Sequence, residues 1–266
     1  MGFLDEILPQ VRSSVRDPRY RLGLPAKTDR PAPSLRRSIE EQAEHGGILV
    51  EFKRVSPGAE LSRLPVRSIA DLTESLTGTD IAGFSCLATR PTFEGGPEQV
   101  AELVGATALP VLFKDFVLDP VQIEVAQRVG ASAILLIGRL ETEGRMETSL
   151  AKLADLAHAA RLEVVLEIHR REELASLSGI TPDVYGVNAR NLDSLALEPG
   201  VAEETIQALP TSRPLLAMSG IESTSQASRY WDLGVDGLLV GSAVARSRDP
   251  AAFVRSLFRT SVKRNR

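Results

Sequence analysis

The sequence holds few of the residues that bind metals or form crosslinks. Its 266 residues include one cysteine, Cys86, and three histidines, His45, His158 and His169, which are scattered without ligand spacing. A single cysteine cannot form an internal disulfide or a thiolate cluster for zinc or iron–sulfur groups. The sequence therefore predicts no structural metal site. We expect Cys86 to be a small buried hydrophobe and His169 to be a cap or packing residue.

An excess of positive charge and long apolar runs are also absent. Lysine and arginine number 31 against 35 acidic residues, which gives a formal net charge of -4. Proteins that grip phosphodiester backbones usually carry the opposite balance. No apolar run approaches the ~18 residues of a membrane span, and the acidic start at Asp5 and Glu6 is unlike a signal peptide. We expect neither nucleic acid nor a membrane as partner, and a cytoplasmic protein that is a monomer or small homo-oligomer.

The first 46 residues differ in pattern from the rest of the chain. Apolar spacing predicts helices over 4–15 and 34–45, joined by a link that carries proline and arginine, and the second helix is expected to stop at Gly46-Gly47. We interpret residues 1–46 as an N-terminal helical extension and residues 47–266 as a barrel, together forming one domain.

From residue 47 onward, short apolar runs alternate with longer amphipathic stretches. The runs predict buried parallel strands at 48–52, 83–87, 110–113, 134–137, 163–166, 184–187, 214–217 and 237–240. The stretches between them predict helices at 68–76, 97–104, 120–129, 147–160, 171–177, 201–209, 223–233 and 249–258. Eight such units fit an α/β fold of the (β/α)8 TIM barrel type. An open doubly wound sheet is disfavoured because the first turn, 53–58, has no dinucleotide-binding glycine pattern.

Polar residues follow the carboxyl ends of several predicted strands, which is where (β/α)8 barrels build active sites. These residues are Glu51, Lys53, Lys114, Glu167, Asn188 and Arg190. Lysines and carboxylates that share one mouth shift the pKa values of one another, and so supply an acid and a base near neutral pH. A purely structural ion pair is the alternative for Glu51 and Lys53.

Two glycine-containing turns follow the last two predicted strands. They are Ser219-Gly220 and Gly241-Ser242. Barrels commonly hold a phosphate at this place with backbone N–H groups, and glycine lets the backbone approach the anion closely. The pair of turns predicts a phosphate-bearing substrate.

Four segments carry a family resemblance that runs in order over about residues 34–258. Residues 51–57, Glu-Phe-Lys-Arg-Val-Ser-Pro, resemble the E-x-K-R-x-S-P signature of indole-3-glycerol phosphate synthases. Residues 110–116 and 186–192 resemble that family's P-V-L-x-K-D-F and G-I-N-x-R-[ND]-L segments, and 239–242 match its closing phosphate turn. The resemblance also implies a helical extension that covers part of the barrel mouth.

The resemblance implies a reaction and a role for each site residue. The family converts 1-(2-carboxyphenylamino)-1-deoxyribulose 5-phosphate to indole-3-glycerol phosphate in tryptophan biosynthesis, with loss of carbon dioxide and water and without a cofactor or metal. Lys114 would be the general acid, Lys53 would position the carboxylate or share acid duty, and Glu167 would be the base. Glu51 would hold the lysines in place. The substrate would be oriented by Asn188, Arg190 and Ser219, and its aromatic ring would contact Phe93 and Phe116. The phosphate would be bound by Ser56, Gly220, Gly241 and Ser242.

One position departs from the family pattern and keeps alternatives open. The family's E-S-G-I segment is Met-Ser-Gly-Ile here, so Met218 replaces a carboxylate with an uncharged thioether. One alternative is a paralogue that acts on a modified anthranilate-derived substrate in secondary metabolism. Another is a catalytically silent phosphate-binding barrel, which the presence of Lys53, Lys114 and Glu167 argues against.

Overall fold

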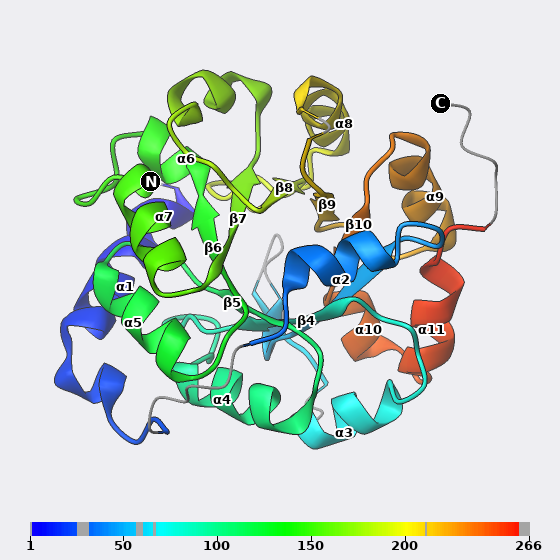
Figure 1. Cartoon of the computed structure of the whole chain (residues 1–266), viewed down its shortest axis with the longest axis horizontal. Coiled ribbons are helices and arrows are strands. Elements are labelled where there is room, and N and C mark those ends of the chain that lie inside the picture. Colours follow the sequence, from blue (N-terminus) through cyan, green and yellow to red (C-terminus); the bar gives the residue numbers. More distant parts are fainter. Residues whose placement is uncertain (1, 26–31, 57–60, 66–67, 211, 261–266) are drawn as a thin grey trace.

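Eight parallel strands close into a barrel in the computed structural model, which describes residues 2–25, 32–56, 61–65, 68–210 and 212–260 (Figure 1). Along the chain the strands are β1 (Gly47–Phe52), β4 (Gly83–Leu87), β5 (Val111–Lys114), β6 (Ala133–Ile137), β7 (Glu163–Ile168), β8 (Val184–Asn188), β9 (Leu215–Met218) and β10 (Gly237–Val240). Each pairs with the next, and β1 pairs with both β4 and β10, so the sheet has no open edge. The predicted (β/α)8 TIM barrel is confirmed.

The strands are buried because they face packed side chains on both sides. Every residue of β1, β4, β6, β9 and β10 is buried. Parallel sheets covered on both faces read as continuous apolar runs, which is why these strands could be located from sequence. Their ends differ from the predicted ones by at most two residues.

Helices surround the strands in a ring (Figure 1). They are α3 (Ile69–Ser75), α4 (Pro97–Ala106), α5 (Pro120–Arg128), α6 (Gly138–Thr142), α7 (Leu150–Ala159), α8 (Pro199–Ala208), α9 (Thr224–Asp232), α10 (Ser242–Arg246) and α11 (Pro250–Leu257). Capping carboxylates precede proline at the starts of α5 and α11, where Asp119 accepts from the Val121 N–H and Asp249 from the Ala252 N–H. None of the helices in the described residues is long and apolar enough to cross a membrane.

The N-terminal helices contact both ends of the barrel. Helix α2 (Leu35–Glu41) lies across the amino ends of the strands, where Ser38 Oγ donates to the Ala82 carbonyl over 2.6 Å and the Arg36 N–H to Glu163 over 2.9 Å (Figure 1). Helix α1 (Phe3–Arg16), followed by the 3-10 helix η1 (Pro18–Arg21), begins at the carboxyl end, where the Phe3 N–H donates to the Asp193 carbonyl. The start of α1 therefore lies at the mouth, while α2 packs on the opposite end.

Several expected elements differ from the observed ones. The predicted helix 34–45 ends at Glu41, and turns lead from there to Gly46, whose φ of 83° is readily adopted by glycine. The predicted helix 171–177 is the 3-10 helix η2 (Arg171–Leu177), with the Glu173 carboxylate bonded back to the Arg170 N–H. The hairpin strands β2 (Val55–Ser56) and β3 (Ser62–Arg63), like α6 and α10, are too short to show a period in the sequence.

The packing of α2 on the amino ends of the strands leads to a stability prediction. Ile39 is fully buried on α2, so Ile39→Ala should lower the free energy of unfolding by about 2–5 kcal/mol through a lost contact and a cavity. Leu22→Ala is the control, because 67% of Leu22 is exposed and its loss should change stability by less than about 0.5 kcal/mol. Urea unfolding measures both. Equal effects of the two variants would contradict the packing described here.

Candidate active site

A cavity of about 550 Å³ lies at the carboxyl ends of the strands. All but one of the residues predicted for the site line it, namely Glu51, Lys53, Ser56, Phe93, Lys114, Phe116, Asn188, Arg190, Ser219, Gly220, Gly241 and Ser242. The exception is Glu167, which is buried directly behind Asn188. Residues far apart in the sequence are therefore gathered at one place, as the strand-end argument predicted.

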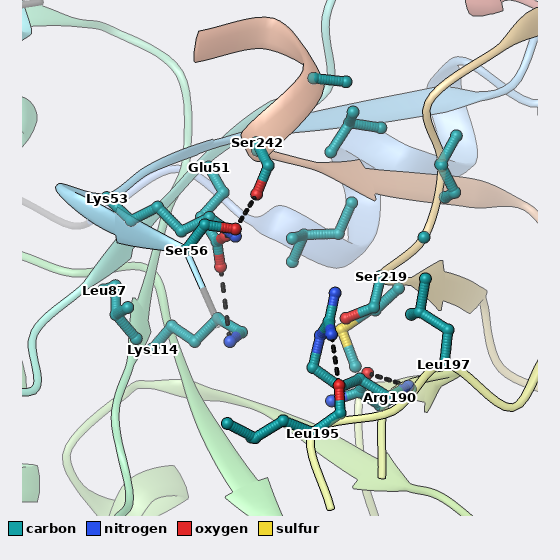
Figure 2. Close-up of a pocket in the computed structure, with 18 of the residues that line it drawn as sticks. Glu51, Lys53, Ser56, Leu87, Lys114, Arg190, Leu195, Leu197, Ser219 and Ser242 are labelled. Atoms are coloured by element: carbon teal, nitrogen blue, oxygen red, sulfur yellow. Dashed lines mark hydrogen bonds and ion pairs between the residues drawn. The ribbon is translucent and has the colours of Figure 1, made fainter. Parts of the chain in front are cut away.

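The Glu51 carboxylate lies between two ammonium groups. Glu51 comes from β1, and its side chain is only 3% exposed. Lys53 Nζ, two residues further on, lies 2.5 Å from Glu51 Oε2, and Lys114 Nζ at the end of β5 lies 3.4 Å from Oε1 (Figure 2). One buried anion thus holds two cations on neighbouring parts of the cavity wall.

This arrangement shifts the three pKa values in different directions. Burial raises the pKa of Glu51, but the charges of Lys53 and Lys114 outweigh it and lower that pKa to about 2. Burial lowers the pKa of Lys53, and the charge of Lys114 adds to the effect. The pKa of Lys114 is raised because Glu51 and Glu167 outweigh its burial. The carboxylate is therefore ionised at neutral pH, and the two lysines differ in how firmly they hold a proton.

The end of β5 is fixed by Asp115, the residue after Lys114. Its carboxylate is buried and accepts hydrogen bonds from Thr89 Oγ1 over 2.6 Å, Gln122 Nε2 over 2.9 Å and the Tyr20 hydroxyl over 3.3 Å. Burial raises the pKa of Asp115, while these donors oppose the rise. Because Tyr20 belongs to η1, the N-terminal segment contributes directly to the backbone that carries Lys114.

Asn188 links the ends of β7 and β8. Its Nδ2 donates to Glu167 Oε1 over 3.0 Å, and its Oδ1 accepts from the Arg190 N–H over 2.9 Å. The Arg190 guanidinium donates to the Leu195 carbonyl and lies across the cavity from Lys53 (Figure 2). Burial lowers the pKa of Arg190, against the nearby carboxylates. The cavity therefore has cations on two sides.

Small polar groups line another part of the cavity. Ser56 Oγ lies 2.7 Å from Ser242 Oγ, which joins β2 to the start of α10 (Figure 2). Ser219 and Gly220 have positive φ values of 70° and 72°, a conformation that costs energy for serine. A Cβ at Gly241 would lie 2.6 Å from Glu51 Oε2, so only glycine fits beside the central carboxylate. The predicted phosphate turns thus lie next to the charged groups.

Aromatic side chains form an apolar wall. Phe93 and Phe116, both buried, lie 5.9 Å and 6.5 Å from the ring of Phe3, measured between ring centroids. Phe3 was not predicted as a site residue, although its place in an extension expected to cover the mouth was a usable signal. The wall offers a flat apolar group a contact surface.

Other lining residues were not found from sequence. The loop after β8 contributes Leu192, Leu195 and Leu197, the loop after β9 contributes Glu222, and the short helix α10 contributes Arg246, its last residue. Loops and single helical turns have no periodic pattern, so nothing in the sequence distinguishes these residues from exposed surface. Only the coordinates place them at the cavity.

Met218 is part of the cavity wall, at the end of β9. It is 1% exposed, lines the cavity and pairs in register with Asn188. A Cβ on Gly186 would lie 2.6 Å from its terminal methyl carbon, so the thioether fills the space above that glycine. An uncharged side chain therefore packs against the strand that carries Asn188.

The described residues contain no group of three histidine, cysteine, aspartate or glutamate side chains placed to hold a metal ion. The cavity instead offers paired ammonium and carboxylate groups, hydroxyls and an aromatic wall. Such a set is suited to general acid–base chemistry on an anionic, partly aromatic molecule.

Residues 4–257 match the sequence profile of the indole-3-glycerol phosphate synthase family. The chain belongs to this family. The indole-3-glycerol phosphate synthase of Methanopyrus kandleri is 35% identical over 260 residues, which cover 96% of this chain and 97% of that protein. The synthase of Shouchella clausii is 32% identical over 259 residues, covering 96% of this chain and 98% of the relative.

Solved structures outside the synthase family share the fold. A thiamine phosphate pyrophosphorylase from Pyrococcus furiosus aligns with a TM-score of 0.58 at 15% identity, over 82% of this chain and 95% of its own. An N-acetylmannosamine-6-phosphate 2-epimerase from Clostridium perfringens aligns with a TM-score of 0.56 at 16% identity, over 76% and 88%. At such identities the likeness shows the barrel architecture alone.

The ion pairs of Glu51 predict a pH-dependent stability difference. In the unfolded chain Glu51 titrates near its ordinary value of 4.5, and in the folded state near 2, so its contribution is present above pH 4.5 and lost as the pH falls toward 2. Glu51→Gln should be less stable than the wild type at pH 7, with a difference that narrows between pH 5 and pH 2. Urea unfolding across this range measures it. A difference independent of pH would show that Glu51 stabilises the fold without its charge.

Proposed function

We propose that this chain is an indole-3-glycerol phosphate synthase. It converts 1-(2-carboxyphenylamino)-1-deoxyribulose 5-phosphate to indole-3-glycerol phosphate with loss of carbon dioxide and water, a step of tryptophan biosynthesis. Family membership over nearly the whole chain supports this function. The observation that carries it is the Glu51 carboxylate between Lys53 and Lys114 in a cavity that also has an aromatic wall.

The reaction needs a proton donor at the substrate's ketone oxygen as the ring closes. We assign this role to Lys114, because its ammonium group reaches the cavity and is held by Glu51. Lys53, on the other side of Glu51, holds the substrate carboxylate or shares the proton transfer. Burial lowers the Lys53 pKa, which favours proton release, whereas the raised pKa of Lys114 keeps its charge in the free enzyme.

Loss of water needs a base near the ring carbon that gives up a proton. We assign this role to Glu167, with Asn188 orienting its carboxylate through the bond of 3.0 Å. Since Glu167 lies behind Asn188, the Asn188 side chain is expected to shift, or a water molecule to relay the proton. Arg190 lies across the cavity from Lys53, with Ser219 nearby. We assign both residues to binding of the substrate, where Arg190 supplies a further positive charge for the substrate carboxylate and contacts the ribulose chain.

The substrate's ends fit different parts of the cavity. Phe93 and Phe116 are assigned to the aromatic ring, and the short polar turns to the phosphate. In this assignment Ser56 and Ser242 donate hydroxyl bonds, while Gly220 and Gly241 let backbone approach the phosphate oxygens. The two hydroxyls, 2.7 Å apart, are placed to grip one anion together.

We also propose the finer properties of the protein. Residues 1–46 are an extension of the same domain as the barrel of 47–266, since α1 and α2 pack on its two ends. A substrate with a phosphate and a carboxylate does not cross membranes unaided, which supports a cytoplasmic site of action. We expect a monomer or small homo-oligomer, and light scattering of the purified protein measures which.

The most direct test of the function is turnover of the purified chain with the carboxyphenylamino-deoxyribulose phosphate. Indole fluorescence should rise as product forms, at catalytic enzyme concentrations. No signal at an enzyme concentration equal to that of the substrate would exclude the proposed activity.

The second candidate function is a paralogous synthase for a modified anthranilate-derived substrate, and Met218 is the observation that favours it. Synthases of the family usually carry glutamate at this place, and the thioether changes both the charge and the shape of the wall beside Asn188. A substrate with an additional apolar group on its ring would contact Met218 favourably.

Removal of the Lys114 ammonium should slow catalysis strongly. Lys114→Ala should reduce kcat by roughly 10²–10⁴-fold, as expected for the loss of a general acid. The exposed Lys152 on α7 provides the matched control, since Lys152→Ala removes a lysine outside the cavity and should leave kcat unchanged. An effect below tenfold for Lys114→Ala would mean that another group donates the proton.

A carboxylate at position 218 separates the two candidate functions. If the unmodified substrate is the natural one, Met218→Glu should raise kcat/KM by about tenfold or more, because it restores a carboxylate to the cavity wall next to Asn188, where it can stabilise charge in the transition state. Met218→Leu keeps an apolar side chain and serves as the control. An unchanged or lower kcat/KM in Met218→Glu would favour the paralogous synthase.

A further inference from the structure

The buried His169 pairs with the partly exposed Glu198 just outside the cavity, and the reaction described above uses neither. His169 follows β7 and is 2% exposed, while Glu198 precedes α8. The imidazole Nδ1 lies 2.8 Å from the Asn188 carbonyl oxygen, and Nε2 lies 3.0 Å from Glu198 Oε2. The ring therefore bridges the end of β8 and the start of α8.

Hydrogen bonds hold the ring through both of its nitrogens. A backbone carbonyl only accepts, so Nδ1 must donate to Asn188. Glu198 also accepts from Arg170 over 2.7 Å and from Asn191 over 3.1 Å. Nε2 therefore lies against a carboxylate that two other donors hold in place.

Carboxylates on the neighbouring elements hold His169 in place. Although burial raises the pKa of Glu198, the bonds from Asn191 and His169 and the charge of Arg170 outweigh it, so that pKa is lowered. On η2, the Glu173 carboxylate accepts from the His169 backbone N–H, and burial raises the Glu173 pKa. His169 is therefore fixed through its backbone as well as through its ring.

The pair holds the part of the backbone on which the site depends. The pairing of β7 with β8 ends at Ile168 and Val187. The next carbonyl of β8, that of Asn188, is bonded to the His169 ring. The ring thus takes the place of a backbone N–H. The side chain of that same Asn188 bonds Glu167 and the Arg190 N–H. A rotation of the Asn188 peptide would therefore move two of the assigned groups at once.

Glu198 fixes the loop that follows. Its Oε1 accepts from Asn191, whose Oδ1 accepts from Arg139 Nη1 over 2.9 Å at the start of α6. This loop carries Leu195, whose carbonyl accepts from the Arg190 guanidinium. The chain of bonds therefore runs from α6 through Glu198 and His169 to the cavity wall.

We propose that His169 is a positioning residue: its ring, held by Glu198, donates to the Asn188 carbonyl and so orients Glu167 and Arg190 for the reaction. The inference rests on the proposed function for its kinetic consequences. Its structural part, a protonated Nδ1 that fixes the Asn188 peptide, is independent of that function.

Two variants of His169 separate the two bonds. Asparagine places an amide N–H near the position of Nδ1, so His169→Asn keeps the bond to the Asn188 carbonyl, whereas His169→Gln places one near Nε2 and keeps only the contact with Glu198. His169→Gln should reduce kcat by about 10–100-fold with little change in KM, and His169→Asn should recover most of that loss. If both variants lose kcat equally, and in proportion to their decrease in Tm, His169 contributes only packing and the proposal is overturned.

A second histidine–carboxylate pair provides the control. His158 on α7 lies 3.0 Å from Asp183, which precedes β8 at the opposite end of the barrel. The corresponding variants His158→Asn and His158→Gln should leave kcat unchanged. A kcat loss in them comparable to that of His169→Gln would contradict a role specific to the Asn188 carbonyl.

Nitrogen NMR tests the structural part without activity. In protein labelled with ¹⁵N-histidine, Nδ1 of His169 should give the signal of a protonated nitrogen. The Asn188 side-chain amide signal should move in His169→Gln and stay in His169→Asn. An unprotonated Nδ1 in the wild type would overturn the proposal, whereas wild-type protein that makes no indole product would overturn the proposed function alone.

Discussion

The site depends on one buried carboxylate between two ammonium groups. Without Glu51, Lys53 and Lys114 would be two like charges with mostly buried side chains, which burial and mutual repulsion both disfavour. With Glu51 ionised, both ammonium groups are held at the cavity. The tight fit at Gly241, where a Cβ would contact Glu51, shows that the backbone is shaped around this carboxylate as well.

The barrel makes this arrangement possible because it brings neighbouring strand ends together. Glu51 and Lys114 come from β1 and β5, which are separated in the sheet by β4 alone, and Asn188 comes from β8 across the cavity. The surrounding segments then complete the site. Helix α1 contributes Phe3 to the aromatic wall, and η1 contributes the Tyr20 hydroxyl that holds Asp115 next to Lys114. The N-terminal segment thus contributes side chains to the cavity wall and to the support of Lys114.

Much of the fold and of the site could be predicted from sequence because both follow local rules. Buried parallel strands are short apolar runs, and residues at their carboxyl ends, such as Lys53 and Asn188, meet at one rim wherever the strands lie. The rest depends on long-range packing. The position of Glu167 behind Asn188, the contact of Phe3 with Phe93, and the bridge made by His169 arise between segments that no sequence period connects. Short helices such as α10 could not be predicted either, because a single helical turn is too short to show a periodic pattern of apolar residues.

The two lysines and Glu51 are assigned a decarboxylating ring closure. The most direct measurement of this role follows carbon dioxide release and indole formation together in one reaction of the wild-type protein with the unmodified substrate. One carbon dioxide is expected for each indole ring through many turnovers. Carbon dioxide released without indole, or no release of either, would contradict it.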